Sequence, residues 1–480
     1  MKSLRQRLSA LLRPGLPELL SLIDARISET IRSRGSIRHL LEQLDRSKAP
    51  LHAFFRDHLH SEIAAKALTV KVLNLCLARY HFEARTTVVL SRPYGLVADP
   101  VNNCNLACPG CVHSPSAKEL HVFNWTSGLL SADRYNALLN AYGPYAIQIT
   151  LCNYGEPLMN PATPAFVRQA KSFLATTTLS TNMTAKKFDA EAWALSGLDI
   201  MTLSIDGATQ PVYERYRRKG DIDQIFRNIR SLVDAKHRLG RDTPLLSWQF
   251  LAFEHNAHEI DAAIAMAREL GVDEIVIATP FDVSWDDPSI RPASVEPRTI
   301  QFDVELAGRS LVENWSPSPD AANAAIDAAF ESSWAAQLAR YPESDLNPGT
   351  ASEHMCHWLY RNMVMDATGR ILPCCAAPRP DADLVFDILN GAAADSFNSE
   401  KYRLARLSFS DKPAYATARA ASSLTADPHC ANCDWYSDQQ SALIDAPAIA
   451  KYFRIAGNGL VDANSVSILS GAAALGSAAE

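Results

Sequence analysis

Short apolar stretches alternate with helical stretches between residues 94 and 282, and this alternation leaves few folds open to the chain. The apolar runs include AIQITLC (146–152), MTLSID (201–206) and DEIVIATP (273–280). Repeated strand–helix units favour a parallel sheet, because parallel strands need a crossover connection. The pattern therefore predicts an α/β fold, a partial (β/α)6 TIM-like barrel, whose site lies at the carboxyl ends of the strands.

The composition changes on both sides of this core, which we place at residues 93–290. Apolar residues at helical spacing predict a helical N-terminal extension at 1–92. Residues 291–355 are rich in Pro and Ser around an Ala-rich stretch, so we expect a linker or helical insertion. A cysteine-rich segment, 356–436, predicts a small C-terminal domain. Small residues dominate the tail at 437–480, whose end we expect to be disordered.

The bulk composition fits an intracellular multidomain protein. With 480 residues, 47% of them hydrophobic, the chain can bury a full core. We find no run of eighteen apolar residues and no secretory signal in MKSLRQRLSALLRPG, which predicts a cytoplasmic location and no transmembrane segment. Ten cysteines in clusters then indicate metal binding rather than disulfides.

The net charge of −7 is distributed unevenly. Residues 1–92 hold sixteen Lys and Arg against eight Asp and Glu. A basic surface of this kind could contact phosphates, acidic lipids or an acidic partner, but a solvated helical surface is the commoner explanation. We see no aromatic and basic stacking platform, so nucleic acid is an unlikely partner.

Three cysteines lie within the eight residues CNLACPGC, at positions 104, 108 and 111. Structural zinc takes four protein ligands, whereas a four-iron cluster held by three cysteines keeps one iron without a protein ligand. The spacing C-x3-C-x2-C alone leaves zinc or an unrelated cluster open.

This motif resembles that of the radical S-adenosylmethionine (SAM) superfamily, and the resemblance extends over residues 94–282. It implies a 4Fe-4S cluster on Cys104, Cys108 and Cys111, whose free iron binds SAM. An electron entering SAM would then release a 5′-deoxyadenosyl radical. In one departure, Gly110 stands where the family often has a bulky residue beside the adenine, so adenine packing must come from elsewhere.

Four further stretches resemble family motifs that contact SAM: NYGEP, STN, SIDGATQPVYERYRRKG and IATP. Arginine suits such a site because it pairs two bonds with a carboxylate. The residues implied by the resemblance are Gly155 and Glu156 for the ammonium, Ser180 and Asn182 for the ribose, Ser204 and Arg217 for the carboxylate, and Ala278 beside the adenine.

A second cysteine set follows in the C-terminal region. DATGRILPC reads as a hairpin that turns at Gly369, and C-x2-C near residue 430 completes four thiols that could hold zinc or an iron–sulfur cluster. The set resembles the SPASM/twitch type of auxiliary domain, which implies a second, auxiliary 4Fe-4S cluster. Its implied ligands are Cys356, Cys374, Cys430 and Cys433, with Cys375 as an alternative to Cys374.

The resemblance implies hydrogen-atom abstraction from a substrate, with two outcomes open. Loss of a proton and of an electron to the auxiliary cluster gives dehydrogenation, an oxidoreductase reaction that the second cluster favours. A thiol that returns a hydrogen atom gives epimerisation, and the candidate donors are Cys152 and Cys375. A small buried hydrophobe is the commoner role of such a cysteine.

The substrate class rests on analogy. Peptide-modifying relatives often carry a small domain of mixed helix and strand, whereas residues 1–92 read as helices. We therefore expect a small sugar, polyol or amino-sugar metabolite, with a peptide or protein as the alternative. The partner implied for reduction is a flavodoxin or ferredoxin. A non-catalytic iron–sulfur electron carrier stays open as a different class, although it would have no use for the SAM-binding set.

Overall fold

The structure is a computed structural model. It describes residues 16–33, 35–59, 61–119, 127–280, 287–302, 320–341, 346, 356–375, 384–390, 396–424 and 426–433. The whole predicted tail at 437–480, together with residues 434–436, thus lies outside the described residues.

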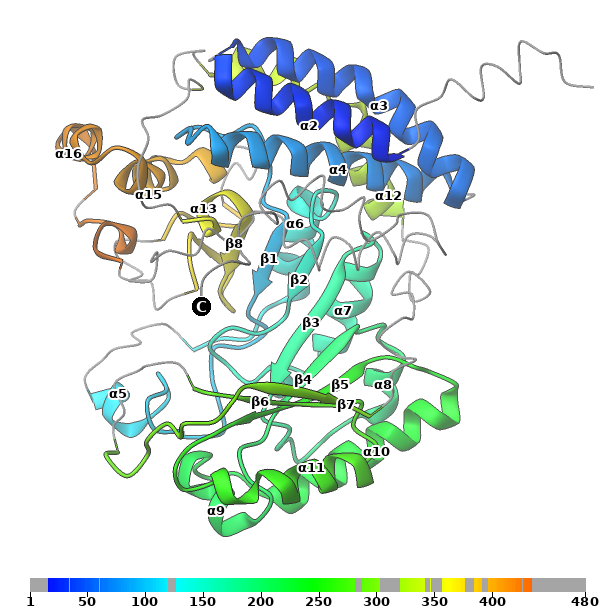
Figure 1. The fold of residues 1–480 in the computed structure, drawn as a ribbon, viewed down its shortest axis with the longest axis vertical. Coiled ribbons are helices and arrows are strands. Elements are labelled where there is room, and N and C mark those ends of the chain that lie inside the picture. Colours follow the sequence, from blue (N-terminus) through cyan, green and yellow to red (C-terminus); the bar gives the residue numbers. More distant parts are fainter. Residues whose placement is uncertain are drawn as a thin grey trace, which may run out of the picture.

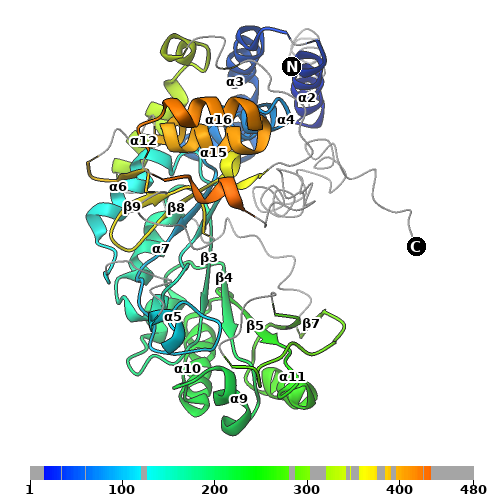
Figure 2. The same ribbon diagram turned by 90° about the vertical axis from the view of Figure 1, so that its left-hand side faces the viewer.

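Six parallel strands form the centre of the molecule in the order β1-β2-β3-β4-β5-β6. Figure 2 shows them as an open, curved layer with helices on its outer side. This is the predicted partial (β/α)6 barrel. The strands are β1 (Gly95–Ala98), β2 (Gln148–Thr150), β3 (Thr176–Thr181), β4 (Ile200–Ser204), β5 (Leu245–Leu251) and β6 (Glu274–Ala278). The helices between them are α5 (Pro115–Glu119), α6 (Ala132–Tyr142), α7 (Thr163–Lys171), α8 (Ala190–Ala194), α9 (Gln210–Tyr216), α10 (Ile222–Leu239) and α11 (Ile260–Glu269).

Local sequence signals set these elements. Buried and partly exposed residues alternate along β3, because successive side chains of a strand point to opposite faces. Asp221 caps α10 by accepting a hydrogen bond from the Gln224 N–H, and Gly240 ends it with a φ of 59°, a left-handed conformation that favours glycine.

The C-terminal region extends the same sheet. Strand β8 (Asn362–Met365) pairs in parallel with β1, and β9 (Arg370–Leu372) and β10 (Phe386–Asp387) follow it antiparallel. At the other edge, β7 (Arg298–Gln301) pairs antiparallel with β6. Gly95 makes room for the Asn362 side chain at the β1–β8 contact, since a Cβ there would lie 2.0 Å from Asn362 Oδ1.

The N-terminal extension is helical, as predicted, with α2 (Leu16–Ser33), α3 (Ile37–Leu59) and α4 (Glu62–Glu83). Figure 1 shows α4 lying between the other two helices and the barrel. Its buried polar side chains bind backbone: Asn74 exchanges two hydrogen bonds with Arg92, and the Leu90 N–H donates to His81 Nε2. The extension thus holds the segment that leads into β1. In the part of the chain that the structure describes, no helix is long and apolar enough to cross a membrane.

The Ala-rich segment predicted to be helical is divided into α12 (Asp320–Glu331) and a 3-10 helix, η5 (Ala335–Arg340). Two residues of α3 bind the backbone where α12 ends and η5 begins. Lys48 Nζ donates to the carbonyls of Phe330 and Ser332 at 2.8 and 2.6 Å, and Asp45 accepts from the Trp334 N–H at 3.0 Å. These contacts satisfy the free carbonyls and N–H groups at the two helix ends.

The remaining helices, α13 (Trp358–Arg361), α15 (Glu400–Ser410) and α16 (Lys412–Ala421), belong to the C-terminal region. Arg406 of α15 is buried and attaches this region to the rest of the chain. Its guanidinium donates to the carbonyls of Leu359, Thr87 and Phe397 at 3.0, 3.0 and 2.8 Å. Thr87 lies far from Leu359 and Phe397 in the sequence. The arginine therefore holds the backbone of distant chain segments together.

Two buried ion pairs repeat at the amino ends of the strands. Asp199, just before β4, binds Lys171 of α7 at 2.8 Å and accepts from the Thr177 N–H of β3 at 2.6 Å. Asp273, just before β6, does the same with Lys236 of α10 at 3.2 Å and the Leu246 N–H of β5 at 2.7 Å. Each aspartate therefore joins two strands and one helix, at the edge of the sheet opposite the predicted site.

We predict that Asp199→Ala destabilises the protein by about 3–5 kcal/mol, because it leaves Lys171 charged and buried without its partner. Glu191→Ala is the control, since Glu191 pairs with Arg238 at an exposed site and its loss costs less than about 1 kcal/mol. Urea unfolding followed by circular dichroism compares the two variants. Equal midpoints would contradict a structural role for the buried pair.

Candidate active site

The cysteine loop begins directly after β1, at the carboxyl edge of the sheet. Leu106 and Cys108 are buried in an apolar cluster with Tyr216, Phe253 and Ile290, and Cys104 and Cys111 pack against the same cluster. The Ala107 N–H donates to the Arg218 carbonyl at 3.2 Å, which ties the loop to the turn after α9. All three predicted cysteines therefore surround one small region.

Burial dominates the chemistry of these thiols. It raises the pKa of Cys104 to about 12 and that of Cys108 to about 11, so both are protonated at neutral pH. Among the described residues, no three His, Cys, Asp or Glu side chains are arranged as metal ligands. The fit to a cluster rests on the donor set: three cysteines, the ligand type that iron–sulfur clusters take, which release their protons when metal binds.

Glu156 links the cysteine loop to β3. Its buried carboxylate accepts from the Thr181 hydroxyl at 2.6 Å and from the Asn182 N–H at 2.7 Å. Its own N–H donates to the Asn103 carbonyl at 2.8 Å, one residue before Cys104. Burial raises the pKa of Glu156, and the hydrogen bonds oppose this shift. The side chain is thus occupied by protein donors, which leaves the backbone as its route to a ligand.

Gly155 packs directly on the start of the cysteine loop. A Cβ at this position would lie 1.6 Å from the Val101 carbonyl oxygen and 2.8 Å from that of Asn103. Only glycine allows two backbone segments to come so close. The pair Gly155–Glu156 therefore sets the height of the loop above the sheet.

Asn182 and Arg217 contact the cysteines themselves. Asn182 Nδ2 lies 3.6 Å from Cys104 Sγ and donates to Asn105 Oδ1 at 2.9 Å. Arg217 pairs with the buried Asp206 at 2.5 Å, and its guanidinium lies near Cys108, where its positive charge opposes the rise in the pKa of that thiol. An arginine held in this way presents fixed donors beside the cysteine loop, as a carboxylate ligand requires.

The inner face of the sheet is lined by small polar residues. Ser180 and Ser204, predicted near SAM, share a hydrogen bond of 2.9 Å, and Thr150 and Thr178 share one of 3.2 Å. All but Ser204 are partly exposed, as is Ala278 at the end of β6. These strand positions therefore offer hydroxyl groups rather than charges.

Cys152 lies on this face at the end of β2. Its sulfur accepts a hydrogen bond from the Ser180 N–H at 3.2 Å, and burial raises its pKa to about 12. The thiol keeps its hydrogen at neutral pH, which a hydrogen-atom donor requires, but a buried structural thiol does the same. Its predicted role stays untested.

The second cysteine set also gathers in space. Burial, with smaller contributions from the nearby Cys374 and Cys433, raises the pKa of Cys356 to about 12. Cys430 lies on the same short 3-10 helix that leads to Cys433, η8 (His429–Asn432). Cys375 is hydrogen-bonded to Cys374, which together with burial raises its pKa, and it packs against Val97, Val364 and Leu372. The structure thus keeps both Cys374 and Cys375 as candidate ligands.

Tyr154 joins the two cysteine sets, and our sequence analysis did not identify it. Its hydroxyl donates to the Cys375 carbonyl at 2.5 Å, and its carbonyl is 2.8 Å from His113 Nε2, two residues after Cys111. Its N–H donates at 3.1 Å to the buried Asp99, whose pKa burial raises to about 7. In the sequence, only its position directly before Gly155 indicated that Tyr154 lies near the site.

Comparisons with known proteins agree with this geometry. Residues 99–245 match the model of the Radical SAM superfamily. The chain is 24% identical over 213 residues to the probable GTP 3′,8-cyclase of Methanococcus maripaludis. This alignment covers 44% of this chain and 68% of that protein. It is also 24% identical over 293 residues to the PqqA peptide cyclase of Gluconobacter oxydans, covering 60% and 71%.

The fold also has solved neighbours. The crystal structure of Streptococcus suis SuiB bound to S-adenosylmethionine aligns with a TM-score of 0.39 and 14% identity. The alignment covers 64% of this chain and 66% of SuiB.

The chain therefore contains a radical SAM domain, as the sequence predicted. The matched residues include the cysteine loop, Glu156, Asn182 and Arg217. The individual SAM contacts assigned from the resemblance stay predictions.

We predict that Glu156→Ala weakens SAM binding by about tenfold or more. It leaves the buried N–H groups of Leu158 and Asn182 without acceptors, a cost of about 1–3 kcal/mol each. SAM affinity of the iron-loaded protein, measured anaerobically by equilibrium dialysis, checks this. Glu254→Ala, at an exposed site, serves as the control. An unchanged affinity would show that Glu156 does not position the site.

Proposed function

We propose that this protein is a radical SAM enzyme that removes a hydrogen atom from a small hydroxyl-bearing metabolite of the sugar, polyol or amino-sugar type. When bound, the cluster and SAM would supply a 5′-deoxyadenosyl radical that takes this hydrogen. The proposed outcome is dehydrogenation: the substrate radical loses a proton to a base and an electron to a second cluster. We place the reaction in the cytoplasm, where thiols stay reduced.

The convergence of Cys104, Cys108, Glu156, Asn182 and Arg217 carries the proposal. Arg217 and Asn182 lie beside the thiols that would hold the cluster, so they can bind and orient a ligand of its free iron. An electron carrier that binds no SAM would need neither the buried Arg217 nor the Glu156 carboxylate that binds β3 beside the cysteine loop.

The hydroxyl groups of the inner face support the substrate class. Thr150, Thr178, Ser180 and Ser204 lie on adjacent strands, so a ligand on this face meets both donors and acceptors. A polyol or sugar matches such a surface with its own hydroxyl groups. We expect a substrate of small charge, because these four strand positions present no ionised side chain.

A peptide is the second candidate substrate, because one curated relative is named a PqqA peptide cyclase. Another relative is named a GTP 3′,8-cyclase, after a nucleotide, so the names of the relatives include both a peptide and a small molecule. Within the described residues before β1 the structure has helices and no strand, in contrast to the mixed domain expected of a peptide-modifying enzyme.

The second cysteine set supports an auxiliary 4Fe-4S cluster on Cys356, Cys374, Cys430 and Cys433. Four cysteines suit a fully ligated cluster, which could accept the electron of an oxidative reaction. Zinc is the alternative metal on ligand type. Epimerisation by a thiol remains the alternative outcome, with Cys152 or Cys375 as donor.

Anaerobic reconstitution tests the proposal. We expect about eight irons per chain, in line with two four-iron clusters, and 5′-deoxyadenosine on addition of dithionite and SAM. Cys104→Ala, Cys108→Ala and Cys111→Ala should abolish 5′-deoxyadenosine, whereas Cys430→Ala with Cys433→Ala should remove only the second cluster. Absence of 5′-deoxyadenosine from the wild type with a reducible cluster would refute a radical SAM enzyme. Four irons with bound zinc would refute the auxiliary cluster alone.

We also predict that Tyr154→Phe uncouples the two sites. The variant keeps the ring and frees the Cys375 carbonyl, so iron content should stay the same while product formed per 5′-deoxyadenosine falls by about tenfold, equivalent to about 1.4 kcal/mol, one hydrogen bond. The electron paramagnetic resonance spectrum of the second cluster should shift.

Tyr142→Phe is the matched control for this prediction. It removes a buried hydrogen bond between Tyr142 and Ser396, which also joins the core to the C-terminal region. We expect lower stability and an unchanged spectrum. An unchanged spectrum and coupling ratio in Tyr154→Phe would contradict the role of Tyr154.

A further inference from the structure

We propose that the basic pocket after α9 is the docking surface for an acidic protein that delivers electrons to the cysteine loop. The inference rests on the proposed function, because reductive cleavage of SAM consumes one electron per turnover. That electron has to come from a donor that approaches the loop from outside.

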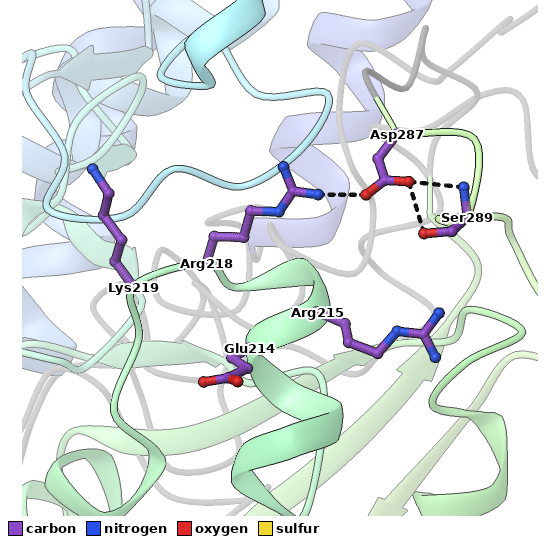
Figure 3. A pocket seen from close by; sticks show the side chains of 6 residues that line it. All are labelled: Glu214, Arg215, Arg218, Lys219, Asp287 and Ser289. Carbon is purple, nitrogen blue, oxygen red and sulfur yellow. Dashed lines mark hydrogen bonds and ion pairs between the residues drawn. The ribbon is translucent and has the colours of Figure 1, made fainter.

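The pocket is open and has a volume of about 310 Å³. Figure 3 shows Arg218 extending to Asp287, with Lys219 on one side of it and Arg215 on the other. Its lining residues are Glu214, Arg215, Arg218, Lys219, Asp287 and Ser289.

The pocket is continuous with the cysteine loop. The carbonyl of Arg218 accepts from the Ala107 N–H, between Cys104 and Cys108. Tyr216, two residues before Arg218, is buried in the apolar cluster that holds Cys108. A protein bound at this surface would therefore contact the segment whose backbone adjoins the loop.

Positive charge exceeds negative charge in the pocket. Arg218 pairs with Asp287, whose carboxylate also accepts from the N–H and hydroxyl of Ser289. Arg215 and Lys219 are exposed, and neither forms an ion pair within the described residues. Burial, together with Arg215, lowers the pKa of the nearby His255 to about 4, so this imidazole stays neutral. Glu214 offsets one of the two free cations, so the lining carries one excess positive charge.

A macromolecular donor fits this surface better than a small anion. The free cations stand at exposed positions around an open pocket, where solvent screens a small ligand. Spread charges of this kind steer the encounter with an oppositely charged protein, and electron-transfer complexes are typically small and transient.

The test compares R215E/K219E with R38E/R46E. Both variants change the charge equally, but Arg38 and Arg46 are exposed on α3, far from the pocket along the chain. Both leave Arg217 and the Arg218–Asp287 pair in place. Purified, reduced flavodoxin of acidic surface serves as the probe at low ionic strength, and dithionite serves as a small reductant in parallel.

We expect R215E/K219E to lower the rate of flavodoxin-driven 5′-deoxyadenosine formation by about tenfold or more at subsaturating flavodoxin. The rate with dithionite should stay the same, and R38E/R46E should match the wild type with both reductants. R215K/K219R, which keeps the charges, should restore the rate. Binding of oxidised flavodoxin, measured by surface plasmon resonance, should weaken in R215E/K219E and lose part of its salt dependence.

Undiminished flavodoxin binding by R215E/K219E would overturn the docking surface. An equal loss with dithionite would also overturn it, because the change would then lie at the cluster. Should R215E/K219E fail to fold, the neutral variant R215Q/K219Q makes the same comparison. If the wild type forms no 5′-deoxyadenosine with dithionite, the proposed function fails, and the binding measurement still decides whether this surface docks the donor.

Discussion

The parallel pairing of β8 with β1 is the contact on which the arrangement of the site depends. Strand β1 has β2 on one side and β8 on the other, and the cysteine loop leaves from its carboxyl end. Because β8 also carries the hairpin that leads to Cys374, this one pairing relates the two cysteine sets. Gly95 permits the close approach, and Asn398 of the C-terminal region reinforces it by exchanging two hydrogen bonds with Val89.

The two edges of the sheet have different tasks. At the amino edge, Asp199 and Asp273 pair with buried lysines and bind the first N–H groups of neighbouring strands, so their charges are satisfied within the protein. At the carboxyl edge, Glu156 and Asp206 are also buried, but their partners lie in the loops that surround the cysteines. The amino edge thus joins strands to helices, while the carboxyl edge holds the loops around the cysteines in fixed positions.

Much of this could be predicted from the sequence, because the signals are local. The strand–helix alternation predicted the parallel sheet, and the cysteine spacing together with the Gly-Glu-Pro stretch predicted the radical SAM domain. What the sequence could not predict are contacts between distant segments. The pairing of β8 with β1 joins residues 95–98 to 362–365, and Arg406 binds the carbonyl of Thr87. Neither leaves a periodic pattern, since both are selected by packing in three dimensions.

Tyr154 shows why such distant contacts matter for chemistry as well as for the fold. Its backbone belongs to the Gly-Glu-Pro loop, whereas its hydroxyl binds the backbone of the C-terminal cysteine pair, so one residue contacts both cysteine regions. The basic pocket adjoins the cysteine loop at a different point, because Arg218 of its lining binds the Ala107 N–H. In the proposed enzyme an electron would enter the loop from the pocket, and an electron from the substrate would leave toward Cys375. Separate places of entry and exit would keep the reducing and oxidising steps apart, which a single cysteine set could not do.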